Sequence, residues 1–202
     1  MPLLVTRPLE EARALVGRLG AHALVAPCLA FEAVRSQRPD LPGADLLVAS
    51  PRAVAPLLAI GLDPTWRVVA LAPATVQALH AVGLPVHCAV EGGGAALAEA
   101  ARPGPVICAT SDLGGDEVLR VRGDAVVWVL YRTVCPPALP AEARDVLAGV
   151  FDVLFTSPSA ARNFEVLAPG ALLRARRVLC NGATTLAEVR AMGREGESTT
   201  VR

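Results

Sequence analysis

The sequence of 202 residues contains no lysine, and all nineteen of its basic residues are arginine. Schiff-base catalysis and lysine nucleophiles are therefore excluded, because both need a side-chain amine. Arginine can still bind carboxylate or phosphate groups through paired hydrogen bonds. The net charge is +0 and the basic residues form no run, so the sequence predicts neither nucleic-acid binding nor attachment to a membrane surface.

Patterns that bind metals or nucleotides are also lacking. The three histidines, His22, His80 and His87, have no carboxylate or cysteine at ligand spacing, so we expect no metal site. Residues 92–94 are three glycines, but they have neither the lysine of a P-loop nor the G-x-G-x-x-G order of a dinucleotide-binding loop. A flexible loop is the preferred interpretation.

Cysteine occurs five times, an odd number without C-x-x-C spacing, which indicates reduced thiols in a cytosolic protein. These residues are Cys28, Cys88, Cys108, Cys135 and Cys180. The first residues form no charged leader, and no apolar run approaches the length that spans a bilayer. We therefore expect a cytoplasmic protein.

What the sequence does contain is a duplicated segment. In Phe151–Phe164 an apolar run ends in Ser157-Pro158, and in Asp45–Val54 another apolar run ends in Ser50-Pro51. Ser157 stands 107 positions after Ser50. A further pair, Leu71–Thr75 and Asn181–Thr185, is 110 positions apart. Two matches at nearly one offset, far longer than a solenoid period, predict two similar α/β units. A ligand lying between them would meet both copies.

Apolar runs alternate with helical patterns along the chain, which is typical of parallel sheets covered on both faces. The N-terminal and C-terminal pieces are each too small to fold alone, so we expect them to join. The predicted fold is α/β, with two similar parallel-sheet, flavodoxin-like domains joined by a two-stranded connector, the second inserted in the first. The expected bounds are 1–30 with 138–202 for the first domain, 38–128 for the second, and 31–37 with 129–137 for the connector strands.

Short hydroxyl side chains stand at the predicted strand-to-helix turns, each placed to cap a helix, and proline follows Ser50 and Ser157 at the first helical position. In doubly wound folds these turns lie at the carboxyl ends of the strands, where ligands bind and helix N-termini attract anions. One such hydroxyl is more often only a cap, so the prediction of a site rests on the whole set. The set comprises Thr6, Ser50, Thr75, Thr110, Ser111, Ser157, Thr184 and Thr185.

Tyr131 is the only tyrosine and lies in the predicted connector. Two interpretations stay open from the residues alone. It is either a half-buried strand aromatic, or a hydroxyl donor at the mouth of a cleft between the domains.

Six short motifs together resemble the uroporphyrinogen-III synthase family over nearly the whole chain. They are LVTRP at Leu4–Pro8, VASPRAV at Val48–Val54, the Pro73–Thr75 turn, Tyr131-x-Thr133, FTSPSA at Phe155–Ala160 and NGATT at Asn181–Thr185. None is specific alone, but their order, spacing and duplication are considerably more so. The chain departs from the family at Ala72-Pro73 and Gly182-Ala183, where Gly-Pro is usual, and at residues 194–202, which are polar where the family continues with a strand and a helix.

The resemblance implies a cofactor-independent lyase. Linear hydroxymethylbilane loses water, its terminal pyrrole ring inverts through a spiro intermediate, and the macrocycle closes as uroporphyrinogen III. By analogy with the family, Tyr131 would assist the departure of water, and the other residues that would line the cleft are Ser50, Thr75, Ser157, Thr184 and Thr185. We add Arg7 and Arg52 as partners for the substrate carboxylates.

The resemblance also bears on partners. Hydroxymethylbilane could be handed over from porphobilinogen deaminase, and we expect a monomer that binds no nucleic acid and no membrane. The main alternative is a non-catalytic two-domain binding module for a small anionic ligand, which fits the absence of an acid-base pair equally well. A transferase with a nucleotide donor is a distant third, because no phosphate loop or ribose-binding acid is visible.

Overall fold

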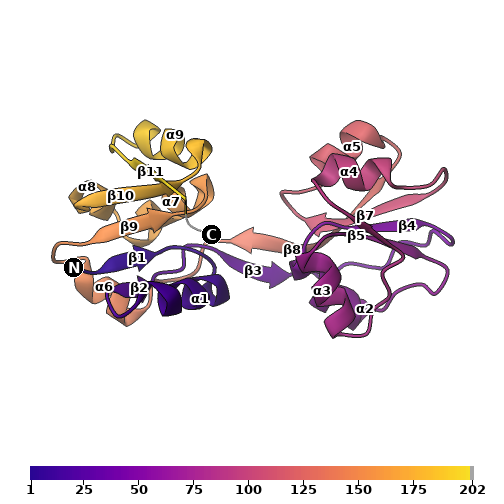
Figure 1. Cartoon of the computed structure of the whole chain (residues 1–202), viewed down its shortest axis with the longest axis horizontal. Helices are drawn as coiled ribbons and strands as arrows, with labels where there is room; N and C mark the ends of the chain where they lie inside the picture. Colours follow the sequence, from indigo (N-terminus) through magenta and orange to yellow (C-terminus); the bar gives the residue numbers. More distant parts are fainter. Residues whose placement is uncertain (201–202) are drawn as a thin grey trace. The chain divides into compact units, whose positions relative to one another are not determined.

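The computed structural model describes residues 1–200, and the chain divides into two compact units. Unit 1 comprises Met1–Ala30 and Val134–Arg202, and unit 2 comprises Phe31–Thr133. The predicted first domain runs to residue 202, so its last two residues, 201 and 202, lie outside the described residues. In chain order, unit 2 is an insertion between the two segments of unit 1 (Figure 1).

Unit 1 contains a five-stranded sheet in which each neighbouring pair of strands is parallel. Its strands are β1 (Leu3–Val5), β2 (Ala23–Val25), β9 (Asp152–Phe155), β10 (Arg177–Asn181) and β11 (Glu197–Thr199). Its helices are α1 (Leu9–Leu19), α6 (Ala141–Val146), α7 (Pro158–Leu167), α8 (Ala171–Arg174) and α9 (Ala183–Ala191).

Unit 2 contains a six-stranded sheet. Its strands are β3 (Ala30–Ala33), β4 (Asp45–Val48), β5 (Arg67–Leu71), β6 (Cys88–Val90), β7 (Val106–Ser111) and β8 (Val126–Val134). Its helices are the 3₁₀ turn η1 (Pro51–Ala53), α2 (Val54–Ile60), α3 (Ala74–Ala81), α4 (Gly94–Glu99) and α5 (Asp116–Val121). The predicted α/β class with parallel sheets is confirmed.

The two sheets share one spatial arrangement but differ in chain order. The strands follow the order β11-β10-β9-β1-β2 in unit 1 and β6-β5-β4-β7-β8 in unit 2, where β3 is added beside β8. The run β9-α7-β10-α9-β11 therefore matches β4-α2-β5-α3-β6, and β1-α1-β2 matches β7-α5-β8. Because the β1-α1-β2 piece comes first in unit 1 and its counterpart comes last in unit 2, the units are circular permutations of each other. A single flavodoxin-like topology for both units is consequently not confirmed.

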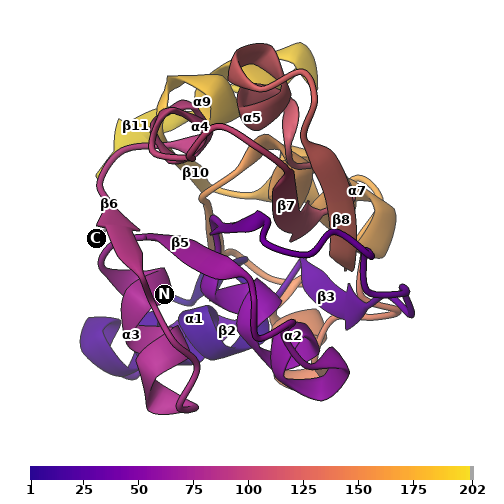
Figure 2. The ribbon, with the colours of Figure 1, turned by 90° about the vertical axis from the view of Figure 1, so that its right-hand side faces the viewer.

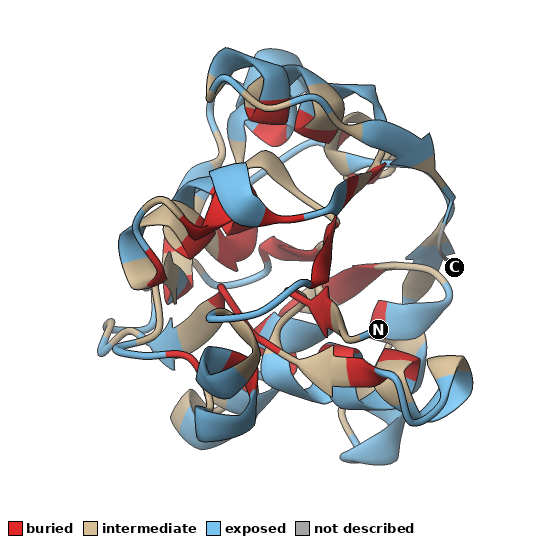
Figure 3. Cartoon of the chain, turned by 90° about the vertical axis from the view of Figure 1, so that its left-hand side faces the viewer, coloured by how far each residue is buried: buried red, intermediate tan, exposed pale blue. Residues whose placement is uncertain are grey.

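Alternating strand residues explain why helices cover both faces of each sheet. In unit 2, Leu46 and Val48 of β4 pack with α2 and α3, while Leu47 between them packs with α4 and α5. Figures 1 and 2 show these two helix pairs on opposite sides of the sheet. In unit 1, Val153 packs on the face of α6 to α9 and Leu154 on the face of α1. Figure 3 shows the buried residues concentrated on the strands.

The polar segment that begins at Arg194 does supply an edge strand, although no apolar pattern in the sequence predicts one. Strand β11 pairs in parallel with β10, with Leu179 opposite Glu197. The Arg194 guanidinium donates hydrogen bonds to the carbonyl oxygens of Ala175 and Arg176. These contacts give unit 1 the counterpart of β6 at the matching edge.

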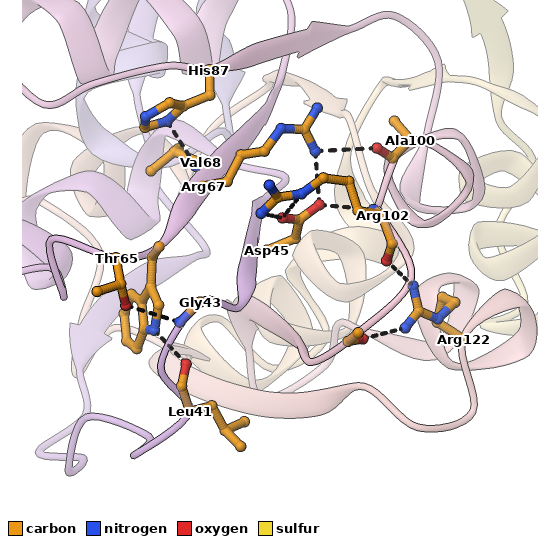
Figure 4. A network of polar contacts seen from close by, with 12 residues as sticks. Leu41, Gly43, Asp45, Thr65, Arg67, Val68, His87, Ala100, Arg102 and Arg122 are labelled. Atoms are coloured by element: carbon orange, nitrogen blue, oxygen red, sulfur yellow. Dashed lines mark hydrogen bonds and ion pairs between the residues drawn. The ribbon is translucent and has the colours of Figure 1, made fainter.

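A buried carboxylate opens the central strand of unit 2 (Figure 4). Asp45 is 2% exposed and accepts hydrogen bonds from Arg67 Nη1 at 2.7 Å and from Arg102 Nη2 at 2.6 Å. Burial raises the pKa of Asp45, but the hydrogen bonds from Arg102 and Arg67 outweigh burial and leave the pKa below its usual value. Asp45 is therefore ionised and holds β4, β5 and the loop before β7 together.

The same device recurs in unit 1. Asp152 is 4% exposed and accepts from Arg176 Nη2 at 2.7 Å and from Arg177 Nη2 at 2.9 Å. The Arg176 and Arg177 hydrogen bonds lower the pKa of Asp152 to about 2. Arg177 lies opposite Asp152 across neighbouring strands, as Arg67 lies opposite Asp45. These pairs keep the 107- and 110-residue offsets of the sequence repeat, so the duplication includes a buried ion pair.

Candidate functional site

The carboxyl ends of the parallel strands bring the polar turns of each unit to one edge of its sheet. In unit 1, Val5 pairs with Leu154 and Phe155 with Cys180, so the turns after β1, β9 and β10 are neighbours. In unit 2, Val48 of β4 pairs with strands on both sides, and the turns after β4, β5 and β7 are neighbours. Each sheet has its topological switch point at this edge, between β9 and β1 in unit 1 and between β4 and β7 in unit 2.

Ser157 caps helix α7 at the switch point of unit 1. Its Oγ accepts a hydrogen bond from the Ala160 backbone N–H at 3.2 Å and lies 3.2 Å from Ser159 Oγ. Pro158 at the first helical position has no N–H to satisfy. Ser159 was not among the predicted site residues, although its place two residues after the cap puts a second hydroxyl in the same turn.

Ser50 occupies the matching turn of unit 2. Its Oγ accepts from the Arg52 backbone N–H at 3.3 Å, and Pro51 stands at the first position of η1. The predicted caps at Ser50 and Ser157 are thus confirmed.

The predicted caps at the threonine turns are wrong. Thr75 and Thr184 are each the second residue of their helices, and the capping positions are Pro73 and Gly182, without a side-chain cap. Thr75 and Thr185 are buried, and Thr185 Oγ1 donates to the Asn181 carbonyl at 3.2 Å, whereas Thr184 is exposed. A hydroxyl inside the first helical turn points back along the helix and bonds to the preceding turn rather than to the free N–H groups.

Thr6 and Thr110 do not cap helices either. Thr6 is fully buried and its Oγ1 donates to the Leu154 carbonyl at 2.7 Å, which joins β1 to β9. The residue that precedes α1 is Pro8, and the one that precedes α5 is Gly115, and neither position has a side-chain cap. Arg7 lies between Thr6 and α1 and is partly buried.

Tyr131 and Arg52 are brought together by a residue that the sequence did not single out. Tyr131 lies on β8, is 8% exposed, and packs edge-on against Phe31 of β3, with ring centroids 6.0 Å apart and planes at 84°. The Arg52 guanidinium carbon lies over the same Phe31 ring, 4.1 Å from its centroid. The strand-aromatic interpretation thus describes how Tyr131 packs. Within residues 1–200 its hydroxyl makes no hydrogen bond, so its ring contacts hold it.

A β-bulge adjoins Tyr131. The pairing of β7 and β8 shifts between Thr110 and Ser111, and places Ser111 opposite Tyr131. The Asp112 backbone N–H then donates to the Tyr131 carbonyl at 3.1 Å, and Asp112 Oδ1 accepts from the Thr133 N–H at 3.1 Å. Bulges of this kind redirect side chains and are frequent next to functional sites.

A pocket of about 280 Å³ lies at the switch point of unit 2, lined by residues that include Ala49, Cys108, Thr110 and Gly114. A Cβ on Gly114 would lie 2.1 Å from Thr110 Oγ1, so only glycine fits there. Burial raises the pKa of the Cys108 thiol to about 11. Cys108 therefore lines the pocket as an uncharged thiol. A second pocket of about 530 Å³, between residues 33–37 and α2, contains none of the predicted site residues.

Among residues 1–200, no group of three or more histidine, cysteine or acidic side chains is arranged to hold a metal ion. In the same range, no helix is long and apolar enough to cross a membrane.

These features define an α/β protein built from two permuted parallel-sheet units, each of which carries one serine-capped turn at its switch point. The sequence profile described as "Uroporphyrinogen-III synthase HemD" matches residues 10–197. The chain belongs to the uroporphyrinogen-III synthase family. Its function is therefore the reaction of that family in tetrapyrrole and heme biosynthesis, and it is an enzyme of the cyclising lyase type.

Solved structures support the fold. The chain resembles the uroporphyrinogen-III synthetase of Helicobacter pylori at 17% identity and a TM-score of 0.69, over 98% of this chain and 92% of that one. It resembles a mutant uroporphyrinogen III synthase of the extremely thermophilic bacterium Thermus thermophilus at 17% identity and a TM-score of 0.53, over 100% of this chain and 93% of that one. A search of curated protein sequences finds no match.

Proposed function

We propose that the chain cyclises hydroxymethylbilane to uroporphyrinogen III without a cofactor, and that the serine turn of each unit binds substrate carboxylates. The observation that carries this proposal is the family match over residues 10–197. The duplicated serine turns support substrate binding by each unit, because a serine-capped turn lies at the switch point of each sheet.

The reaction asks little acid-base chemistry of the protein. The lone pair of a pyrrole nitrogen assists the departure of the terminal hydroxyl as water. The carbon that carried the hydroxyl becomes electrophilic. The substituted carbon of the last ring attacks this electrophile and forms the spiro intermediate, whose rearrangement inverts that ring before closure. The protein mainly has to fold the chain and select the attacking carbon. This limited demand on the protein is consistent with the absence of a strong acid-base pair among the predicted site residues.

Tyr131 is the proposed proton donor to the leaving hydroxyl. A tyrosine hydroxyl can donate one hydrogen bond. Its ring is packed in β8 beside the bulge at Ser111, which gives the hydroxyl a defined position. A defined donor is useful here because the water must leave before the ring can attack.

The substrate carboxylates are the proposed ligands of the turns and of two arginines. The α7 turn offers the hydroxyls of Ser157 and Ser159 together with the positive end of a ten-residue helix. Arg7 follows β1 at the same edge, and Arg52 follows Ser50 in the matching turn of unit 2. Thr184, the exposed residue of the α9 turn, adds a further hydroxyl, whereas Thr75 and Thr185 shape their turns from inside.

We also propose that the protein acts as a cytoplasmic monomer that receives its substrate from porphobilinogen deaminase. Hydroxymethylbilane closes on its own to the type I isomer, so direct transfer or fast capture protects the type III product. Arginine side chains can offer bidentate hydrogen bonds to the carboxylates in transit.

The test couples the purified protein to porphobilinogen deaminase and separates the product isomers by chromatography. Deaminase alone is the control and supplies isomer I. We expect isomer III as the main product, and we expect it also after dialysis against a chelator. Isomer I alone would contradict the cyclase and leave the binding module, whereas loss of isomer III after dialysis would contradict cofactor independence.

A further inference from the structure

Phe31 contacts both a proposed catalytic residue and a proposed carboxylate ligand. It lies on β3, is half-buried, and presents its ring to Tyr131 at 6.0 Å between centroids and to Arg52 at 4.1 Å. All three residues belong to unit 2, so this arrangement is internal to one compact unit. They come from three separate elements: β3, η1 and β8.

The Tyr131 phenol depends on ring packing for its orientation. Within residues 1–200 its hydroxyl makes no hydrogen bond. The edge-to-face geometry with Phe31, at 84° between planes, is the preferred geometry of an aromatic pair. An aliphatic side chain at position 31 would replace this rigid ring contact by a flexible one, and the Tyr131 ring would be less firmly oriented.

The Arg52 guanidinium packs on the same ring. Arginine stacks by its face on aromatic rings and donates hydrogen bonds in its own plane, so stacking sets the direction of those donors. Arg52 also belongs to the turn that Ser50 caps, through its backbone N–H. Ser50 therefore supports the backbone of Arg52, and the Phe31 ring supports its guanidinium.

We propose that Phe31 is a positioning residue for the cyclisation, whose ring aligns the Tyr131 phenol and the Arg52 guanidinium on one substrate. This inference rests on the proposed function, since it assumes that Tyr131 and Arg52 act on hydroxymethylbilane. Phe31 itself need not touch the reacting atoms.

Because Tyr131 is the only tyrosine, ¹³C-labelled tyrosine gives a single set of ring resonances in an NMR spectrum. The Phe31 ring current shifts these resonances in the wild-type protein. We expect Phe31→Leu to move them, and we expect Glu32→Gln to leave them in place. Glu32 is the matched control, because it is the next residue of β3 and forms an exposed ion pair with Arg132. Unchanged Tyr131 resonances in Phe31→Leu would overturn the proposal.

Steady-state kinetics test whether Phe31 affects turnover and substrate binding. We expect Phe31→Leu to lower kcat about tenfold through misplacement of Tyr131, and to raise KM about threefold through the loss of the Arg52 stack. Phe31→Tyr keeps a ring and should restore both constants to near the wild-type values. A Phe31→Leu enzyme with wild-type kcat and KM, or a Phe31→Tyr enzyme as poor as Phe31→Leu, would contradict the proposal. If Phe31→Leu does not fold by circular dichroism, Phe31→Met is measured instead and read in the same way.

A double-mutant cycle separates this inference from the proposed function. Tyr131→Phe removes only the hydroxyl and should lower turnover, with little change in melting temperature. In that background we expect Phe31→Leu to cause little further loss of kcat, because the group it positions is gone. Equal losses in both backgrounds would overturn the positioning role alone. Full turnover by Tyr131→Phe would instead contradict the catalytic role of Tyr131 and so the proposed mechanism.

Discussion

Ser50 and Ser157 each combine a structural role with a proposed binding role, and the two roles can be measured separately. Each serine Oγ accepts a hydrogen bond from a backbone N–H of its own turn. We expect Ser50→Ala and Ser157→Ala each to lower the free energy of unfolding by about 0.5–2 kcal/mol. Activity should fall only modestly, because several turns share the substrate carboxylates.

Thr184→Ala is the matched control at the residue scale. Thr184 is exposed and caps nothing, so its loss should leave the free energy of unfolding unchanged in a urea titration and affect only KM. Complete loss of turnover in any one of these three variants would mean that a single hydroxyl does the chemistry. That result would contradict a site made of many weak contacts.

Local sequence signals predicted some of these residues and not others. Ser50 and Ser157 were predictable because proline at the first helical position marks the cap with little ambiguity. The threonines were assigned to the wrong role, because a position one or two residues inside the helix cannot be told from the cap without the backbone. Phe31 carried no local signal, since its contact with Tyr131 depends on the tertiary pairing of β3 with β8.

At the scale of elements, the buried aspartates at the starts of β4 and β9 hold the two sheets in register. The folded-state pKa of Asp152, about 2, is below the value for an unfolded chain. Its ion pairs therefore contribute stability that is fully present above about pH 4 and is lost as the pH falls through the folded pKa.

We expect Asp152→Asn to lower the free energy of unfolding by roughly 2 kcal/mol at pH 7. The difference from the wild-type protein should shrink to roughly half near pH 3, because the unfolded chain is then mostly protonated at Asp152 while the folded protein is not. Urea titrations between pH 3 and pH 7 measure this dependence. Asp124→Asn is the control, since Asp124 pairs with Arg122 at the surface and should show a smaller difference. A difference for Asp152→Asn that stays constant with pH would contradict the ion-pair account.

These aspartates also show what the sequence pattern could not reveal. Asp45 and Asp152 stand inside the repeated segments, but nothing local distinguishes a buried aspartate with two arginine partners from an exposed one. Their partners Arg67 and Arg177 become neighbours only through the parallel strand register. Polar strand β11 was missed for a related reason, because an edge strand held by backbone pairing needs no apolar run.

At the scale of the whole molecule, the repeat is an internal duplication with permuted chain order. The sequence predicted two similar units because the motifs around Ser50 and Ser157 keep their spacing. It could not predict the permutation. The β1-β2 pair and the β7-β8 pair are recognised as counterparts only from their places beside β9 and β4 in the two sheets. The divergence to 17% identity from the solved relatives also leaves only the turns recognisable.

The permutation has a consequence for binding. Matching turns lie at matching switch points, so each unit offers a similar polar edge to an elongated ligand with many carboxylates. If this is how the protein holds a tetrapyrrole, neither unit alone should account for the interaction. The product is a suitable probe, because it carries the same carboxylates as the substrate.

Hydrogen–deuterium exchange with and without uroporphyrinogen III, kept reduced under argon, tests this claim most directly. We expect the product to slow amide exchange in peptides that cover the Ser50 turn and in peptides that cover the Ser157 turn. Peptides that end at Val48 and at Phe155, the last residues of β4 and β9, exclude the turns and provide the internal reference, so their exchange rates should not change. Slower exchange in both turns is the result that the account predicts, and slower exchange in one unit alone would contradict it.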